Sequence, residues 1–543
     1  TPPLPPPPAE PMPHRVVRAS AGTGKTYALT TRFVWCLRRG ASPESVLAST
    51  FTRKAAGEIL GRVLYRLADA STDDEEAATL SRDLGDEALR RPHYRVMLRM
   101  LGRSLHRLSI STLDAFFYRI ARSYRFELGF GAGTQVVDDA DPLAASMQEQ
   151  ALQAILGHAD ATDDMAALLE MLRRLHHDST QRSVIESLRR ILTGDGSTLL
   201  SLYREAPDRR RWQQLEAAGS LDRTQVASLI DDMRQLADDL PKTKQGLPNK
   251  RFAEAWARTL EQATYRRWEA FATDSFCQRF LESEPKFSGC EITDAWREVY
   301  DPLIAHASAE LVRSIAEQTE ATFDLIHRFE TEYAALRRRN NVLLYSDLPL
   351  LLEGLSIGGD LSLEDIYFRL DGQVEHLLLD EFQDTSLQQW DVVRPLAEEI
   401  CAHGDATRSF FCVGDMKQAI YGWRGGCPEL LGDLPRQLGL PDEAVESANK
   451  SYRCSPVVLD TVNRVFSHLV GLPPLGERFD AAALRWQQMF EQHTAAYDDR
   501  PGHVTFQTTT RPPEPDPKLT LEEQDDEGEV TGVRPTGPIS ATS

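Results

Sequence analysis

Hydrophobic residues near the start of the chain follow two alternating patterns. Short runs that contain apolar residues, at residues 14–18, 45–51 and 107–110, have the length of buried strands. Each is followed by a longer stretch in which apolar residues recur three and four positions apart, as in an amphipathic helix. Strand and helix in regular alternation predict an α/β fold with a parallel sheet.

The pattern changes in the middle of the chain and returns afterwards. Residues 139–340 show only the helical period, which predicts a helical insertion of roughly 200 residues. Apolar strands followed by polar residues then reappear in "EHLLLDEFQDTS" and "RSFFCVGDMKQ". The lead, residues 1–13, is rich in proline, and the tail, residues 506–543, combines proline, threonine and acids, so both are predicted to be disordered.

Length and composition limit the class of protein. A chain of 543 residues is too long for one hydrophobic core and predicts two to four domains. No apolar run is long enough to span a membrane, and the lead lacks the pattern of a signal peptide. Seven scattered cysteines without a C-x-x-C pair indicate reduced thiols in a cytoplasmic protein, without disulfides or a zinc site.

Charge is distributed unevenly along the chain. The net charge is −21, yet residues 1–130 contain 20 Lys and Arg against 13 Asp and Glu. A basic segment within an acidic protein can follow a phosphate backbone, or it can simply be a set of solvated helix faces. Charge alone favours neither interpretation.

A phosphate-binding loop is predicted at "ASAGTGKT", which follows the first strand and precedes a helix. The pattern is G-x-x-x-x-G-K-[ST] with Ala19 at its first position, where alanine is acceptable if its φ stays negative. Gly22 and Gly24 let successive N–H groups face one anion, Lys25 reaches the β- and γ-phosphates, and Thr26 offers a hydroxyl to Mg²⁺. The alternative is a glycine-rich turn before an amphipathic helix.

Two acids at the end of a later strand complement this loop. Asp380 is placed to hold Mg²⁺ through water, and Glu381 to orient and deprotonate the attacking water. Ligands bind at the carboxyl edge of parallel sheets, where both acids are expected. Gln418 is a candidate sensor of the γ-phosphate.

Two aromatic residues beside an arginine suggest contact with bases. Tyr421, Trp423 and Arg424 lie on one short polar segment, where the rings could stack on nucleic-acid bases. The alternative interpretation is that both aromatics belong to the core.

Together these blocks carry a family resemblance. In order, ASAGTGKT, STFTRKAA, ISTLDAFF, LLLDEFQDTS, VGDMKQAIYGWRGG and NKSYRCSP resemble the UvrD/Rep/RecB class of superfamily 1 DNA helicases. Ala at the first loop position and the large insertion are most similar to the RecB and AddA subunits of double-strand-break repair complexes. The resemblance implies an ATP- and Mg²⁺-dependent helicase that moves 3′→5′ on single-stranded DNA, acts at DNA ends and has an AddB-like partner.

The resemblance also implies roles for individual residues. Gln383 and Gln418 would couple the γ-phosphate to DNA contacts, Tyr452 would stack on adenine, and Arg453 would touch the γ-phosphate. The implied nucleotide-binding set is Ala19, Ser20, Ala21, Gly22, Thr23, Gly24, Lys25, Thr26, Gln383 and Tyr452. The implied DNA path is Phe51, Thr52, Ser111, Thr112, Tyr421 and Trp423.

The domain plan implied by the resemblance is a RecA-like domain 1A split by a helical domain 1B and followed by the start of a second RecA-like domain, 2A. The predicted ranges are 14–138 and 341–440 for 1A, 139–340 for 1B, and 441–505 for 2A.

Two features depart from the family pattern. No adenine-reading Gln precedes the loop, and the later 2A motifs are not visible, which suggests a C-terminally truncated chain. The alternative function is therefore an ATP- or DNA-binding remnant that works only in a complex. An unrelated phosphate-loop enzyme such as a kinase does not explain the Tyr-x-Trp-Arg and Ser-Tyr-Arg blocks.

Overall fold

A computed structural model describes two compact units, the first ending at Tyr452 and the second beginning at Arg453. The described residues are 4–5, 13–131, 133–157, 197–213, 215, 219–242, 247–282, 286–358, 362–403, 407–422, 425–472 and 479–507. Trp423, Arg424 and most of the predicted tail lie outside these ranges.

The first unit is built on a six-stranded sheet in the order β10-β1-β9-β8-β2-β3, with every neighbouring pair parallel. The strands are β1 (Arg15–Ala19), β2 (Val46–Thr50), β3 (Ser109–Thr112), β8 (His376–Leu379), β9 (Ser409–Gly414) and β10 (Val445–Ala448). The predicted α/β fold with a parallel sheet is confirmed. The third predicted strand begins two residues later than expected, at Ser109.

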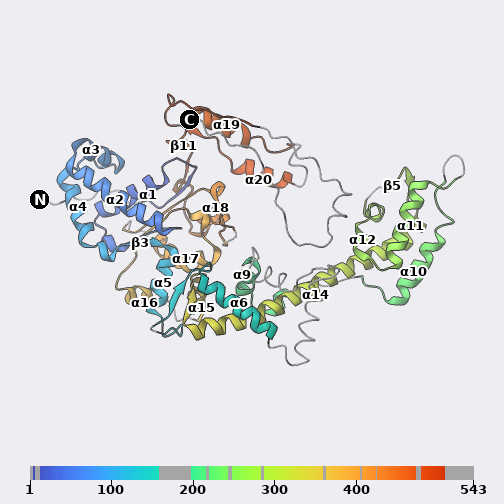
Figure 1. Cartoon of the computed structure of the whole chain (residues 1–543). Helices are drawn as coiled ribbons and strands as arrows, with labels where there is room; N and C mark the ends of the chain where they lie inside the picture. The colour runs from blue at the N-terminus through green and yellow to red at the C-terminus, as the bar shows by residue number, and fades with distance from the viewer. Residues whose placement is uncertain are drawn as a thin grey trace, which may run out of the picture. The chain divides into compact units, whose positions relative to one another are not determined.

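Helices cover both faces of this sheet, which explains why the central strands β8 and β9 are apolar along most of their length. Leu47 and Leu377 face one core and Ala48 and Leu378 the other. One face is covered by α1 (Lys25–Arg38), α2 (Arg53–Thr72), α3 (Asp74–Asp83) and α4 (Arg91–Arg103). The other is covered by α5 (Leu113–Ser123), α15 (Asp347–Gly358), α16 (Leu363–Leu370), α17 (Leu387–Ala402) and α18 (Glu429–Gln437) (Figure 1).

The middle of the chain is organised around α14 (Asp294–Asn340), a helix of 47 residues. Figure 1 shows α10 to α12 around its N-terminal part, where they share an aromatic core, and α6 beside its C-terminal part. The other helices are α6 (Pro142–Gly157), α9 (Ser197–Glu205), α10 (Arg223–Gln235), α11 (Lys250–Thr264), α12 (Trp268–Thr273) and α13 (Ser275–Gln278).

Two short strand pairs accompany these helices. The antiparallel hairpin of β5 (Lys286–Phe287) and β6 (Cys290–Glu291) is not predicted by the helical pattern. Strands β4 (Gln135–Val137) and β7 (Val342–Leu344) pair in parallel where the chain enters and leaves this region.

Two sequence predictions need correction. The pattern places the residues of β10 at the start of a second domain, from residue 441, but β10 pairs with β1 in the first sheet, and the first unit runs to Tyr452. Part of the predicted disordered lead is bound: Leu4 packs against the α1–α4 core, and the Pro5 carbonyl accepts a 2.9 Å hydrogen bond from Arg38 Nη1. Hydrophobic periodicity could not predict either feature, because a four-residue strand and a single leucine are too short to show a repeat.

The second unit contains α19 (Pro456–Phe466) and α20 (Asp480–Met489). The rings of Phe466 and Trp486 pack 5.5 Å apart and join the two helices.

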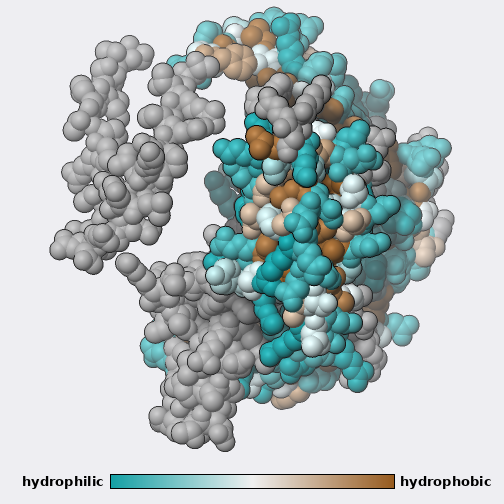
Figure 2. Space-filling model, turned by 90° about the vertical axis from the view of Figure 1, so that its right-hand side faces the viewer, coloured by the Kyte–Doolittle hydropathy of each residue, from teal (hydrophilic) through white to brown (hydrophobic). Residues whose placement is uncertain are grey.

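Hydrophilic side chains predominate on the face shown in Figure 2, with apolar ones in small groups among them. Within the described ranges, no helix combines the length and the apolar character needed to cross a bilayer.

Candidate nucleotide-binding site

The predicted phosphate-binding loop lies between β1 and α1. Gly22 and Gly24 have φ values of 76° and 91°, in the left-handed region that favours glycine, and Gly24 is the N-cap of α1. Ala19 is the last residue of β1, only 2% exposed, and it is absent from the residues with positive φ. Alanine at the first position of the motif therefore causes no backbone strain.

A second segment of the first unit supports the loop. The Thr23 hydroxyl donates to the Ser20 carbonyl at 2.8 Å, and the Ser20 N–H donates to the Ala448 carbonyl at 3.0 Å. The Tyr452 N–H donates to the Gly22 carbonyl at 2.8 Å. Tyr452, predicted to stack on adenine, is thus attached to the loop while its side chain stays exposed.

The loop lysine contacts the second acid of the acidic motif. Lys25 Nζ lies 2.7 Å from Glu381 Oε2, which joins two predicted catalytic residues that are 356 positions apart in the chain. Glu381 has a φ of 50°, so the backbone turns sharply after β8. The ion pair shows that a γ-phosphate bound by Lys25 would lie within reach of Glu381.

Asp380 is a buried carboxylate that suits a divalent cation. Its N–H donates to the Ser49 carbonyl at 2.8 Å, and burial, reinforced by the charge of Glu381, raises its pKa to about 6. A cation beside Asp380 would relieve this electrostatic cost, and the oxygen ligands of Asp380 and Thr26 are the type that Mg²⁺ prefers.

In the described part of the chain, no three His, Cys, Asp or Glu side chains converge as metal ligands.

The raised pKa of Asp380 predicts a pH effect on nucleotide binding. Asp380 must be ionised to attract Mg²⁺, so the affinity for Mg-ADP should fall as the pH drops through about 6. Isothermal titration calorimetry between pH 5 and 8 measures this. Burial also raises the pKa of nearby Asp384 to about 6, so Asp384→Asn is the control. If the midpoint disappeared in Asp384→Asn, the titrating group would be Asp384 and not Asp380.

Gln383 connects Glu381 to the end of β9. Its Nε2 donates to Glu381 Oε2 at 2.8 Å, and its Oε1 accepts from the Asp415 N–H at 2.9 Å. Gln383 is 1% exposed, and a Cβ on Gly414 would lie 2.7 Å from Gln383 Oε1. Glycine at position 414 is therefore required for this close approach.

Gln418 joins the same chain of contacts indirectly. Gln418 Nε2 donates to Asp415 Oδ2 at 2.7 Å, and Lys417 Nζ lies 3.1 Å from Asp415 Oδ1. Strand β9 lies between β1 and β8, so its carboxyl end stands between the loop and the acids. The structure thus connects Gln418 to Glu381 through Asp415 and Gln383.

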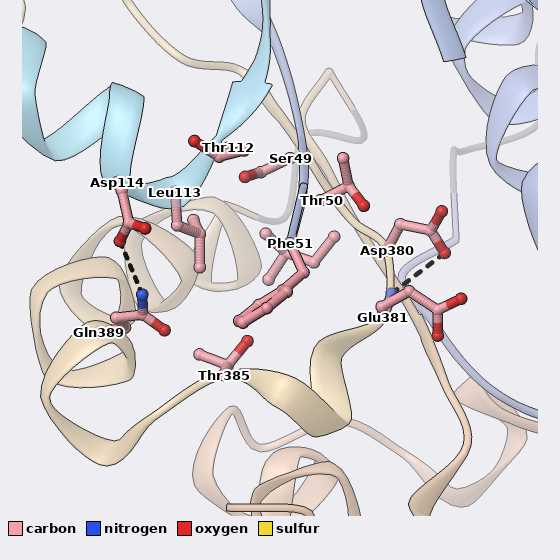
Figure 3. A pocket seen from close by; sticks show the side chains of 11 residues that line it. Ser49, Thr50, Phe51, Thr112, Leu113, Asp114, Asp380, Glu381, Thr385 and Gln389 are labelled. Atoms are coloured by element: carbon pink, nitrogen blue, oxygen red, sulfur yellow. Dashed lines mark hydrogen bonds between the residues drawn. The ribbon is translucent and has the colours of Figure 1, made fainter. Parts of the chain in front are cut away.

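A recess opens beside the acids, at the ends of β2, β3 and β8 (Figure 3). It is lined by Ser49, Thr50, Phe51, Thr112, Leu113, Asp114, Leu379, Asp380, Glu381, Thr385 and Gln389. Phe51 extends across it toward Thr385, and its ring centroid lies 4.3 Å from that of Tyr421. Two predicted DNA-path residues, Phe51 and Thr112, therefore line the recess together with the predicted catalytic acids, and a third, Tyr421, contacts Phe51.

The structure says less about the predicted roles of the remaining DNA-path residues. Thr52 caps α2 by accepting from the Ala55 N–H, and the Ser111 hydroxyl donates to the Thr112 carbonyl. Trp423 lies outside the described residues. Arg453, which is predicted to touch the γ-phosphate rather than DNA, belongs to the second unit. Their roles remain predictions.

The recess also contains polar residues that motif reasoning missed. Gln389 Nε2 donates to Asp114 Oδ1 at 2.8 Å on the side of the recess away from Asp380 (Figure 3). Thr50 and Thr385 line it as well. Thr50, Thr385 and Asp114 lie within recognised sequence blocks and Gln389 shortly after one, so the rule that ligands bind at the carboxyl ends of parallel strands could have identified them.

Comparison with known proteins agrees with this geometry. Residues 8–438 match the model of the UvrD/REP helicase N-terminal domain. The chain belongs to the UvrD/REP helicase family. Its relatives include the A subunit of the ATP-dependent helicase/nuclease of Limosilactobacillus fermentum, 23% identical over 87% of this chain and 37% of that protein.

Two further relatives carry the same name. The proteins from Moorella thermoacetica and Acetivibrio thermocellus are 25% and 22% identical, over 86% and 94% of this chain. Those alignments cover 35% and 42% of the respective relatives. The chain thus spans about two fifths of the length of these proteins.

Proposed function

We propose that this chain is an ATP-dependent single-stranded-DNA translocase and helicase that moves 3′→5′ in recombinational double-strand-break repair. The observation that carries the proposal is the Lys25–Glu381 contact beside a recess lined by Phe51. It supports a site in which phosphate-binding and base-stacking groups share one edge of the sheet.

The proposed reaction is hydrolysis of Mg-ATP. Lys25 and the loop N–H groups bind the phosphates, while Thr26 and Asp380 hold Mg²⁺, which neutralises phosphate charge when bound. Glu381, released from Lys25 by the γ-phosphate, orients and deprotonates a water molecule. Tyr452 stacks on adenine, and Arg453 stabilises charge on the γ-phosphate.

The same contacts support coupling to DNA. Arrival or loss of the γ-phosphate changes the partners of Glu381, and Gln383 and Asp415 transmit this change to Gln418 and the segment that carries Tyr421. In this proposal, residues 14–138 and 341–440 with β10 form domain 1A, residues 139–340 form 1B, and 2A follows.

The names of the relatives support the helicase part of the proposal. Their name describes one subunit of a helicase/nuclease, which implies further subunits. We extend this to the present chain as action on DNA ends together with an AddB-like partner.

Displacement of streptavidin from biotinylated oligonucleotides tests the proposal. A 3′→5′ translocase runs toward the 5′ end, so we expect ATP-dependent displacement from 5′-biotin and much slower displacement from 3′-biotin. Glu381→Gln, which is expected to hydrolyse ATP only slowly, is the negative control. ATP-dependent DNA binding without displacement from either end would support the alternative, a binding module that acts only within a complex.

Replacing Phe51 with alanine is expected to weaken binding of single-stranded DNA by about 1–3 kcal/mol, because one base loses its stacking surface. Fluorescence anisotropy with a labelled oligo-dT measures the effect. Phe368→Ala is the control, since Phe368 on α16 is 86% exposed and lies outside the recess. Equal losses in both variants would contradict a specific stacking role for Phe51.

A further inference from the structure

Thr50, the last residue of β2, carries a buried hydroxyl for which the described structure offers no hydrogen-bond partner. The residue is 3% exposed and lines the recess beside the acids. Burying a hydroxyl without a partner is unfavourable, and such groups in native proteins usually serve a purpose or hold a water molecule. The position of Thr50 indicates what that purpose is.

Thr50 lies between two functional strands. It pairs in register with Thr112 of β3, and the register of β2 with β8 continues from Ser49–Leu379 to place Asp380 on its other side. The Asp380 N–H donates to the Ser49 carbonyl, which fixes this arrangement. Figure 3 shows the Thr50 hydroxyl on the Asp380 side of the recess.

Thr50 also lies on the face of the sheet that α1 and the predicted phosphate-binding lysine cover. Side chains alternate along a strand, so Thr50 lies on the same face as Ala48, which packs in the core of α1 to α4. Helix α1 begins at Lys25, the phosphate-binding lysine. The unpartnered hydroxyl therefore faces the nucleotide side of the sheet.

The next residue in the chain faces DNA in the proposed function. Phe51 directly follows Thr50, and its ring contacts that of Tyr421. One peptide bond thus joins a group beside the metal-binding carboxylate to a group predicted to stack on bases. This shared peptide plane offers a short route by which a movement of the backbone at Phe51 would reach the Thr50 hydroxyl.

We propose that Thr50 is a positioning residue that couples single-stranded DNA at Phe51 to the acid Asp380. Its hydroxyl lies on the Asp380 side of the recess, and a base stacked on Phe51 sets the position of that hydroxyl relative to the Asp380 carboxylate. This inference rests on the proposed function and adds the residue through which DNA reaches the hydrolytic site. A hydroxyl merely tolerated in the core would have no such effect.

Thr50→Val tests the inference, because valine has the same shape and lacks the hydroxyl, and Thr50→Ser is the matched variant that keeps it. The measured quantity is the Kd for oligo-dT with and without a non-hydrolysable Mg-ATP analogue. Coupled sites typically change each other's affinity by about 5–150-fold. We expect such a ratio in the wild type and in Thr50→Ser, and a ratio within two-fold of one in Thr50→Val.

The outcomes separate the two proposals. The nucleotide-free Kd of Thr50→Val should match the wild type, and its thermal midpoint should be equal to or higher than that of the wild type, because valine removes an unpartnered buried hydroxyl. Thr50→Ala should show the same loss of coupling. A wild-type ratio in Thr50→Val would overturn the inference and leave the helicase proposal standing. If the two Kd values of the wild type were equal and DNA did not stimulate its ATP hydrolysis, both the inference and the helicase proposal would be overturned.

Discussion

Replacing Glu381 with glutamine is expected to slow ATP hydrolysis by about 10²–10⁴-fold, the usual contribution of a positioned general base. Glutamine keeps the volume of glutamate and can still accept hydrogen bonds from Lys25 and Gln383. It cannot take a proton from water. The affinity for Mg-ADP should therefore stay within a few fold of the wild type, and the loss should appear in kcat alone.

Lys25→Ala provides the contrast to Glu381→Gln. It removes the cation that lies 2.7 Å from Glu381 Oε2 and that is predicted to bind the phosphates. Both nucleotide affinity and kcat should fall, as measured by calorimetry and by phosphate release. If Glu381→Gln lost affinity as severely as Lys25→Ala, Glu381 would be a binding residue and its assignment as the base would be wrong.

The second large effect concerns stability where the helical region joins the sheet domain. Arg337 near the end of α14 lies 2.6 Å from Glu330 and also pairs with Asp347, the first residue of α15. Arg204 of α9 approaches the same two carboxylates at 3.3 and 3.5 Å. The Asp347 carboxylate also accepts from the Leu344 N–H of β7 at 3.1 Å. Two arginines and two carboxylates thus form one buried cluster.

Arg337→Met is expected to destabilise this junction by about 3–5 kcal/mol, because it leaves two buried carboxylates with a single cation. Hydrogen exchange of the Leu344 amide measures the effect locally, through the free energy of the opening that exposes it. Exchange at this amide should accelerate by more than a hundred-fold.

Arg339→Met is the matched control, since Arg339 is exposed in the same last turn of α14. A surface change of this kind should cost less than about 0.5 kcal/mol. Equal protection of Leu344 in the two variants would show that the buried cluster does not stabilise the junction.

Sequence predicted the features that depend on local pattern. Short apolar stretches, Val16–Val17, Val46–Ala48 and Leu377–Leu379, marked β1, β2 and β8 because helices cover both faces of the sheet. Gly22 and Gly24 marked the loop because only glycine readily adopts their backbone conformations. The contact between Lys25 and Glu381 followed from the rule that parallel strands bring their carboxyl ends to one edge.

Features that depend on distant or very short segments could not be predicted. Strands β5 and β6 have two residues each, too few to show a period. The place of β10 beside β1 depends on pairing across more than four hundred residues. The unpartnered hydroxyl of Thr50 is visible only once its neighbours in three dimensions are known.

The central claim is that one chain couples ATP hydrolysis to single-stranded DNA, and the most direct test is the steady-state rate of phosphate release with and without oligo-dT. The account predicts that DNA raises kcat at least ten-fold in the wild type and that Glu381→Gln reduces both rates to background. A wild-type rate that DNA does not change, or one that persists in Glu381→Gln, would contradict it.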